Sequence, residues 1–421
     1  MKKLALAIVV AFLAFSPAVF AADLLLKDND IVAINGDSIT EQKEYSVLME
    51  DYLLMCKPAQ GIRAAQFGWG GETAAGFQGR MVNDVLWLKP TVATTCYGMN
   101  DGGYKPLDKG TVDFYTKNSV AMVKKFKEAG VRTIIVGSPG AVDSQTFGGN
   151  NPERATMYNK TLGSLRDIAK EVAAAEGVFF ANVHDPMIDA MAKAKAKYGN
   201  AYHVCGGDGV HPGRNGQLIM AYAFLKAMGI DGNIGTITVD MAASKAEVTD
   251  GHKVLSAAGG VVEIESSRYP FCFQGNPKDP NATTGIIEFF PFNQDLNRFT
   301  LVVKNAPAGQ VKVTWGAVSK EFASADLAKG INLAAEFAAG NPFSEPFAKV
   351  EQVIRKQQNF ETTLHKQLLH ELGNYKNQLP EAKDALDQVA AAAIKRDAVL
   401  FGESAAAVVP VKHTIKIEAV K

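Results

Sequence analysis

The chain has 421 residues, a length typical of two domains rather than of one small core. Its 44 Lys and Arg residues balance 44 Asp and Glu residues, so the formal net charge is zero. A neutral chain without a basic cluster argues against nucleic acid as a partner and gives no sign of electrostatic membrane docking. Hydrophobic residues make up 47% and charged residues 21%, which excludes disorder as the main state.

Residues 1–21 have the build of a secretory signal peptide. Lys2 and Lys3 precede an apolar run over 4–15, and small residues occupy the −3 and −1 positions of a cleavage site after Ala21. An uncleaved membrane anchor is the alternative, but the run is short for a span and Pro17 interrupts it. We therefore expect cleavage and an exported protein, periplasmic or extracellular, with no membrane span after removal of the signal.

The cysteines are few and widely spaced: Cys56, Cys96, Cys205 and Cys272. They do not form a disulfide scaffold, and no pair has the spacing of zinc ligands, so we expect no metal site. Cys96 lies in an apolar run and is most simply a buried small hydrophobic residue. Export would permit one disulfide, whose pairing the sequence leaves open.

Short apolar runs alternate with helical segments between residues 22 and 230. Strands are expected at 31–34, 61–67, 91–97, 131–136 and 178–183, and helices at about 41–55, 73–88, 112–129, 152–175 and 215–228. This alternation predicts a parallel sheet with helices on both faces. Ligand sites of such sheets form at the carboxyl ends of the strands, where the glycine-rich turns of this chain fall.

The pattern changes near Gly229. Short alternating runs with turn signals predict a β-rich, sandwich-like module over 231–340. Two long helical stretches broken at Leu379-Pro380 then predict a helical hairpin, and the alternation over 412–420 indicates a returning strand. The expected organisation is a signal peptide, an α/β domain, a β-rich module, and a helical hairpin with a terminal strand, over 1–21, 22–230, 231–340 and 341–421.

The loops after the predicted strands carry residues suited to acyl transfer. Ser38 follows the first strand at the start of a helix, after Asp37, although capping of the helix is the plainer interpretation of this pair. Asn100 follows the third strand, where it either donates a hydrogen bond to a ligand or only forms a turn. Asp208 stands three residues before His211, which allows its carboxylate to fold back onto the imidazole.

Gly71 closes the turn after the second strand, where a glycine lets backbone N–H groups approach a ligand closely. Together these residues supply what acyl transfer needs without a cofactor. Ser38 is the candidate nucleophile, His211 the base and Asp208 the acid that orients it. The N–H groups of Ser38 and Gly71 and the amide of Asn100 are the candidate oxyanion donors.

Three further residues are weaker candidates for substrate binding. Trp69 and Met99 each neighbour a candidate oxyanion residue, and they either wall an acyl pocket or pack in the core. Asp37 directly precedes the candidate nucleophile. The sequence does not decide between these interpretations.

Four blocks of the chain resemble the SGNH hydrolases, also called the GDSL esterase/lipase family, over about 28–228. The blocks are Gly36-Asp37-Ser38, Gly71, Gly98-Met99-Asn100-Asp101 and Asp208-Gly209-Val210-His211-Pro212. The resemblance implies a three-layer α/β/α sandwich with a five-stranded parallel sheet (SGNH/flavodoxin-like), followed here by the β-rich module and the C-terminal helical segment. Gln66 stands where many relatives carry Asn, which loosens a supporting hydrogen bond but removes no catalytic role.

The resemblance implies a serine esterase that hydrolyses carboxylic esters through an acyl-enzyme intermediate. Export and the appended β-rich module favour a small or polymeric ester, an acetylated carbohydrate or glycan, as the substrate. Two alternatives stay open: a lysophospholipase/lipase-type ester hydrolase, and a non-catalytic carbohydrate-binding protein on a hydrolase scaffold. The motifs fix neither the acyl length nor the leaving group, and the oligomeric state is equally open.

Overall fold

The computed structural model describes residues 23–420, so the expected signal peptide lies outside the described residues. The first half of the chain is built on one sheet of parallel strands in the order β2-β1-β3-β4-β5. Its strands are β1 (Ile31–Gly36), β2 (Arg63–Gly68), β3 (Val92–Cys96), β4 (Thr133–Gly137) and β5 (Phe179–Ala181). Their small and apolar residues suit strands that are buried on both faces.

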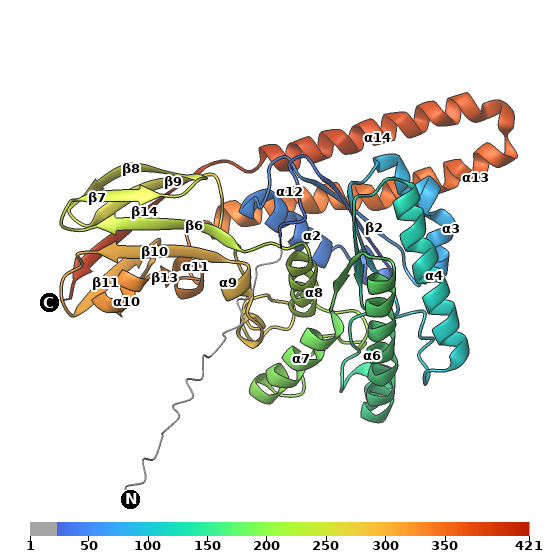
Figure 1. The fold of residues 1–421 in the computed structure, drawn as a ribbon, viewed down its shortest axis with the longest axis horizontal. Coiled ribbons are helices and arrows are strands. Elements are labelled where there is room, and N and C mark those ends of the chain that lie inside the picture. Colours follow the sequence, from blue (N-terminus) through green and yellow to red (C-terminus); the bar gives the residue numbers. More distant parts are fainter. Residues whose placement is uncertain (1–22, 421) are drawn as a thin grey trace, which may run out of the picture.

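Helices cover both faces of this sheet (Figure 1). Helices α2 and α8 pack together on one face, and α3, α4 and α6 pack on the other. The helices of this unit are α1 (Ser38–Glu41), α2 (Tyr45–Asp51), η1 (Tyr52–Cys56), α3 (Ala74–Asp84), η2 (Leu86–Leu88), α4 (Lys109–Glu128), α5 (Phe147–Asn150), α6 (Pro152–Ala175), α7 (His184–Tyr198) and α8 (Arg214–Ala227). The expected three-layer α/β/α sandwich is confirmed.

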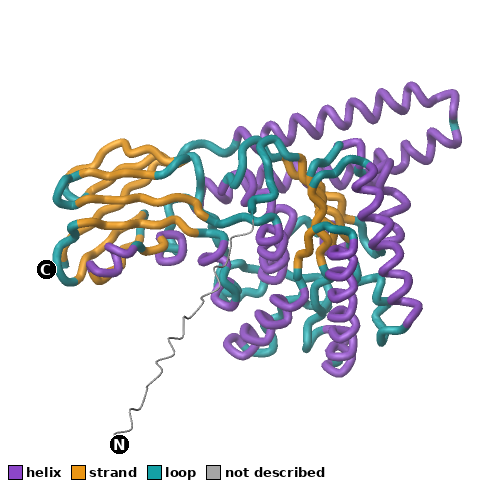
Figure 2. The backbone as a smooth tube through the Cα atoms, viewed as in Figure 1, coloured by secondary structure: helices purple, strands orange, loops and turns teal. Residues whose placement is uncertain are grey.

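A second group of strands lies at the other end of the molecule (Figure 2). One sheet has the order β13-β10-β6-β7 and the other the order β12-β11-β14-β9-β8. The strands are β6 (Asn233–Asp240), β7 (Lys245–Val248), β8 (His252–Ala258), β9 (Val261–Ser266), β10 (Arg298–Lys304), β11 (Gln310–Trp315), β12 (Val318–Ala323), β13 (Ile331–Asn332) and β14 (Val411–Ala419). The module also holds η3 (Ile287–Phe289), α9 (Phe292–Asp295), α10 (Ser324–Lys329) and α11 (Leu333–Glu336).

Buried aromatic residues fill the core of the β-rich module. Trp315 of β11 is fully buried, and its Nε1–H donates to Nδ1 of His413 at 3.1 Å. Phe299 of β10 packs 5.9 Å from the Trp315 ring, and Phe343 packs against both. Because His413 belongs to β14, the last strand of the chain completes the core of this module.

A long helical hairpin connects the two halves. It consists of α12 (Ser344–Thr362), η4 (Thr363–Leu369), α13 (His370–Gln378), η5 (Pro380–Ala382) and α14 (Lys383–Ala406). Helix α12 lies along β2, the edge strand of the parallel sheet. Its side chains pair with the free backbone groups of that edge: Glu361 accepts from the N–H of Gln66, and Gln357 donates to the carbonyl of Ala64. An edge strand that would otherwise be open to pairing is thereby covered.

Buried carboxyl groups lie under the hairpin. Glu50 of α2 accepts hydrogen bonds from Gln357 and Gln358 at 2.8 and 2.7 Å, and burial raises the pKa of Glu50 to about 7. Both oxygens of Asp51 are buried and find no hydrogen-bond partner within residues 23–420, and burial raises the pKa of Asp51 well above its usual value. Burial likewise raises the pKa of Glu361. Burial thus favours the protonated form of these carboxyl groups.

All four cysteines are free thiols in the described chain, and all are buried. Burial raises the pKa of Cys96 well above its usual value, which fits an unreactive core residue. Over residues 23–420, no helix combines the length and apolar character needed to cross a bilayer.

Candidate active site

Ser38 lies at the carboxyl edge of the parallel sheet, at the first position of α1. The turn from β1 is tight: a Cβ on Gly36 would lie 2.0 Å from Oγ1 of Thr40, so only glycine fits there. Asp37 caps the helix, because its Oδ1 accepts the N–H of Ile39 at 2.9 Å. The cap and the turn together fix the Ser38 hydroxyl at this edge.

His211 and Asp208 face Ser38 from the loop before α8. The Ser38 hydroxyl lies 2.8 Å from Nε2 of His211, and Nδ1 of His211 lies 2.6 Å from Oδ2 of Asp208. The carboxylate accepts the Nδ1–H, which leaves Nε2 as the acceptor of the serine proton. The structure thus joins the three candidate catalytic residues in one chain of hydrogen bonds.

Hydrogen bonds within the loop that carries Asp208 and His211 hold it in one conformation. Oδ1 of Asp208 accepts the backbone N–H groups of Val210 and His211, both at 2.9 Å. Burial alone would raise the pKa of Asp208, but these N–H groups and the His211 ring lower it overall. Gly206 has a positive φ of 81°, and a Cβ there would lie 1.8 Å from the carbonyl oxygen of His211. The loop therefore holds an ionised carboxylate beside the imidazole.

The Asn100 amide lies near both Asp37 and Glu72. Its Nδ2 donates to the backbone carbonyl of Glu72 at 3.0 Å and lies 3.5 Å from Oδ2 of Asp37. Its Oδ1 accepts from the hydroxyl of Tyr104 at 3.1 Å. Burial raises the pKa of Tyr104 to about 12, so this hydroxyl stays a donor and fixes the orientation of the amide. No motif in the sequence marks Tyr104.

Gly71 lies on the turn between β2 and α3, with a positive φ of 71° and open space where a Cβ would be. Arg80 of α3 holds both ends of this turn. Its Nη2 donates to the carbonyl of Phe67, and its Nε and Nη2 donate to the Glu72 carboxylate, all at 2.6–2.7 Å. The hydroxyl of Tyr97 donates to the same carboxylate at 2.9 Å. We refer to residues 67–72 as the Gly71 turn.

The weaker candidates have clear positions. Trp69, on the Gly71 turn, is half-buried, and the cations of Arg80 and Lys366 each lie 4.9 Å from its ring centroid. The ring of His370 lies at the same distance. Met99 is 2% exposed and packs in the hydrophobic core. Trp69 thus contacts the helical hairpin, which the sequence did not indicate.

Asp37 and Asp101 are buried carboxyl groups behind the candidate nucleophile. Burial raises the pKa of Asp37 to about 7, and the carboxylates of Asp101 and Glu72 add to this effect. Burial raises the pKa of Asp101 to about 6, although the N–H groups of Ala74 and Gly98 donate to it at 3.0 Å. Both residues anchor backbone turns of the site. Across residues 23–420, no three His, Cys, Asp or Glu side chains are grouped so that they could hold a metal ion.

A solved structure of a gut microbial diltiazem-metabolizing enzyme superposes on this chain with a TM-score of 0.72 at 23% identity. The match covers 94% of this chain and 98% of that enzyme, so the arrangement of both halves and the hairpin recurs there. An acetyl xylan esterase variant from Geobacillus stearothermophilus and an alpha/beta hydrolase from the metagenome of Lake Arreo, Spain, match at 22% and 23% identity. Each match covers 49% of this chain and has a TM-score of 0.40. The match covers 97% of the esterase variant and 99% of the Lake Arreo hydrolase.

Comparison by sequence is more specific. No curated protein matches the chain. Residues 34–219 match the profile of the GDSL-like Lipase/Acylhydrolase family, and this range contains Ser38, Asn100 and His211. The chain is therefore a carboxylic ester hydrolase whose residues 34–219 match the GDSL-like Lipase/Acylhydrolase family.

Proposed function

We propose that this protein is an exported serine esterase that works through an acyl-enzyme intermediate. The observation that carries the proposal is the hydrogen-bonded chain from the Ser38 hydroxyl through His211 to Asp208, with distances of 2.8 and 2.6 Å. A serine hydroxyl becomes nucleophilic when a neutral imidazole takes its proton, and a carboxylate on the far side of the ring favours the imidazolium. The described residues supply all three groups.

The proposed reaction has two halves. The Ser38 Oγ attacks the ester carbonyl while His211 takes its proton, and the tetrahedral intermediate carries a negative oxygen. The N–H groups of Ser38 and Gly71 and the Asn100 amide are the proposed donors to that oxygen. The alcohol then leaves with the proton from His211, and a water molecule, activated by the same imidazole, releases the acid from Ser38.

The proposed substrate is an acetylated carbohydrate or glycan outside the cytoplasm, in the periplasm or beyond. Residues 1–21 support export by their composition. The β-rich module supports a large leaving group, because an esterase of small soluble esters needs no second module of this size. The reaction itself needs no metal or other cofactor, since the three side chains generate the nucleophile.

The test is hydrolysis of p-nitrophenyl acetate by the wild-type protein, Ser38→Ala and a control, Ser164→Ala. Ser164 is a serine of α6 whose hydroxyl donates to the carbonyl of Lys160 in the same helix, its one hydrogen bond to the described residues. Ser38→Ala should lose at least about 10³-fold in kcat and fail to react with a fluorophosphonate, because no other group forms the acyl-enzyme. Ser164→Ala should match the wild type. Full activity or full labelling of Ser38→Ala would contradict the proposal.

A further inference from the structure

A polar hollow of about 430 Å³ is lined by residues that follow Ser38 and His211 in the chain. Gln42 lies one turn after Ser38, and its N–H donates to the Ser38 carbonyl at 3.1 Å. Pro212 and Arg214 directly follow His211. The other walls come from parts of the chain far away in sequence, Asn281 of the β-rich module and Arg355 of α12. The hollow is therefore composite and borders the loop that carries His211.

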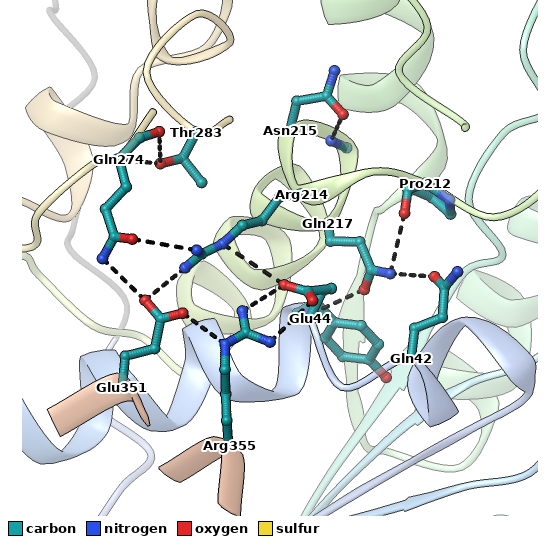
Figure 3. A network of polar contacts seen from close by, with 12 residues as sticks. Gln42, Glu44, Pro212, Arg214, Asn215, Gln217, Gln274, Thr283, Glu351 and Arg355 are labelled. Atoms are coloured by element: carbon teal, nitrogen blue, oxygen red, sulfur yellow. Dashed lines mark hydrogen bonds and ion pairs between the residues drawn. The ribbon is translucent and has the colours of Figure 1, made fainter. Parts of the chain in front are cut away.

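The charges of the hollow are paired with one another (Figure 3). Arg355 forms two hydrogen bonds to the carboxylate of Glu44, at 2.9 and 2.6 Å, and a third to Glu351 at 2.8 Å. Arg214 donates to the other oxygen of Glu351 at 2.6 Å. Two guanidinium groups thus face two carboxylates, so this wall presents donors and acceptors without a net charge.

The chemistry of the walls indicates the class of ligand. Among the described residues that line the hollow, Pro212 is the one with an apolar side chain, so a fatty acyl chain would gain little there. A charged group would gain nothing from cations and anions that already neutralise each other. Amide, carboxylate and guanidinium groups around one hollow suit a neutral ligand rich in hydroxyl groups.

The position of the hollow indicates which part of the ester it would hold. When the bond between the acyl carbon and the ester oxygen breaks, the leaving oxygen takes the proton from Nε2 of His211. The leaving alcohol must therefore lie on the His211 side of Ser38. Pro212, which directly follows His211 in the chain, lines the hollow. We infer that it is the leaving-group subsite and that it takes a neutral saccharide.

The β-rich module contributes a wall of this subsite. Its loop around Asn281 contacts the loop after His211, because a Cβ on Gly213 would lie 2.9 Å from both the Pro280 carbonyl and Oδ1 of Asn281. Gln274 of the same module binds Arg214 and Glu351 at 3.4 and 3.1 Å. The module therefore reaches the catalytic loop directly, and this contact gives it a role in the choice of leaving group.

The inference rests on the proposed function and is tested by a ratio of rates. We would measure kcat/KM for acetylated cellobiose and for p-nitrophenyl acetate with the wild-type protein, Asn281→Ala and Asn281→Trp. Asn281 is exposed, so neither change disturbs a packed core, and thermal melting checks the fold. The kcat/KM for acetylated cellobiose divided by that for p-nitrophenyl acetate should fall about 10-fold in Asn281→Ala, which is the effect of one lost hydrogen bond. The same ratio should fall further in Asn281→Trp, because the larger side chain fills the hollow. The loss should appear mainly in KM.

Lys278→Ala is the matched control, because Lys278 is exposed in the same loop and does not line the hollow. Its ratio should equal that of the wild type. A ratio within twofold of wild type in both Asn281 variants would overturn the inference. The inference would also be overturned if the wild-type protein hydrolysed p-nitrophenyl acetate through Ser38 but did not hydrolyse acetylated cellobiose. In that case the proposed serine esterase activity would stand. If the wild type hydrolyses neither ester, the proposed function falls, and the inference falls with it.

Discussion

Arg80 is the residue on which the Gly71 turn depends most, although none of the catalytic motifs includes it. The side chains of Arg80 and Glu72 are only 4% and 5% exposed. Replacing Arg80 with Met keeps most of the packing volume and removes the guanidinium. The Glu72 carboxylate then keeps only the Tyr97 hydroxyl as a side-chain donor, and the Phe67 carbonyl loses the Arg80 hydrogen bond.

The magnitude follows from the burial of this pair. Removing one partner of a buried ion pair typically costs about 3–5 kcal/mol, because the remaining charge is left uncompensated. The free energy of unfolding should therefore fall by about 3–5 kcal/mol in Arg80→Met at pH 8. Burial already raises the pKa of Glu72, and without Arg80 this carboxyl would take up a proton in the folded state more readily. The loss should accordingly be smaller at pH 5.

The assay is urea unfolding of the wild type, Arg80→Met, Glu72→Gln and the double variant at both pH values. In the double variant Glu72 is no longer a stranded charge, so part of the loss should return. What remains is about 1–3 kcal/mol for the Phe67 carbonyl and the loss of Arg80 as a partner of buried Asp84, which keeps the His370 ring at 2.9 Å. Because the Glu72 carbonyl holds the Asn100 amide, kcat for p-nitrophenyl acetate should fall in Arg80→Met more than KM changes. Strictly additive single losses, or a loss below about 1 kcal/mol in Arg80→Met, would refute the reasoning.

Three further predictions concern single residues. Asn100→Ala should lower kcat about 10²–10³-fold with a modest change in KM, while a fluorophosphonate still labels Ser38; loss of labelling would contradict this. Tyr104→Phe removes the donor to Oδ1 of Asn100 but leaves the hydrogen bond from its Nδ2 to the Glu72 carbonyl, so kcat should fall by less than in Asn100→Ala. An equal loss would show a larger role for Tyr104. Asp51→Asn removes a carboxyl that is protonated when folded and ionises when unfolded. The free energy of unfolding of the wild type therefore falls as pH rises above about 3.9. The free energy of unfolding of Asp51→Asn minus that of the wild type should accordingly grow from pH 5 to pH 8, by at most about 1.4 kcal/mol per pH unit. An equal difference at both pH values would contradict this.

The parallel sheet could be predicted because its information is local. Buried parallel strands are short apolar runs, and each helix between them is marked by its periodicity and by a Gly or Pro at its end. The turns after β1, β2 and β3 and the loop before α8 carry the candidate residues. Because parallel strands bring their carboxyl ends to one edge, the order of strands and loops along the chain is enough to predict Ser38 near His211.

The residues that support the site gave no such signal. Arg80 of α3 meets Glu72 and Phe67 across the turn that joins β2 to α3, and no motif has that spacing. Tyr104 reaches Asn100 from a turn at which it takes a positive φ of 56°, which is unusual for a tyrosine. Likewise, the alternation over 412–420 indicates a strand but not its neighbours, which are β11 and β9. Contacts between distant segments depend on the whole fold.

Gln66 shows how a departure from the family pattern is matched elsewhere in the chain. The resemblance alone suggested that Gln in place of Asn weakens the support of the Gly71 turn. In the structure Oε1 of Gln66 accepts the N–H of Gly68 at 3.0 Å, and Nε2 donates to the carbonyl of Gln358 and to Oγ1 of Thr362. The longer side chain thus supports the turn and also reaches α12. Since Glu361 of the same helix accepts the Gln66 N–H, the helical hairpin holds this end of the Gly71 turn through both the backbone and the side chain of one residue.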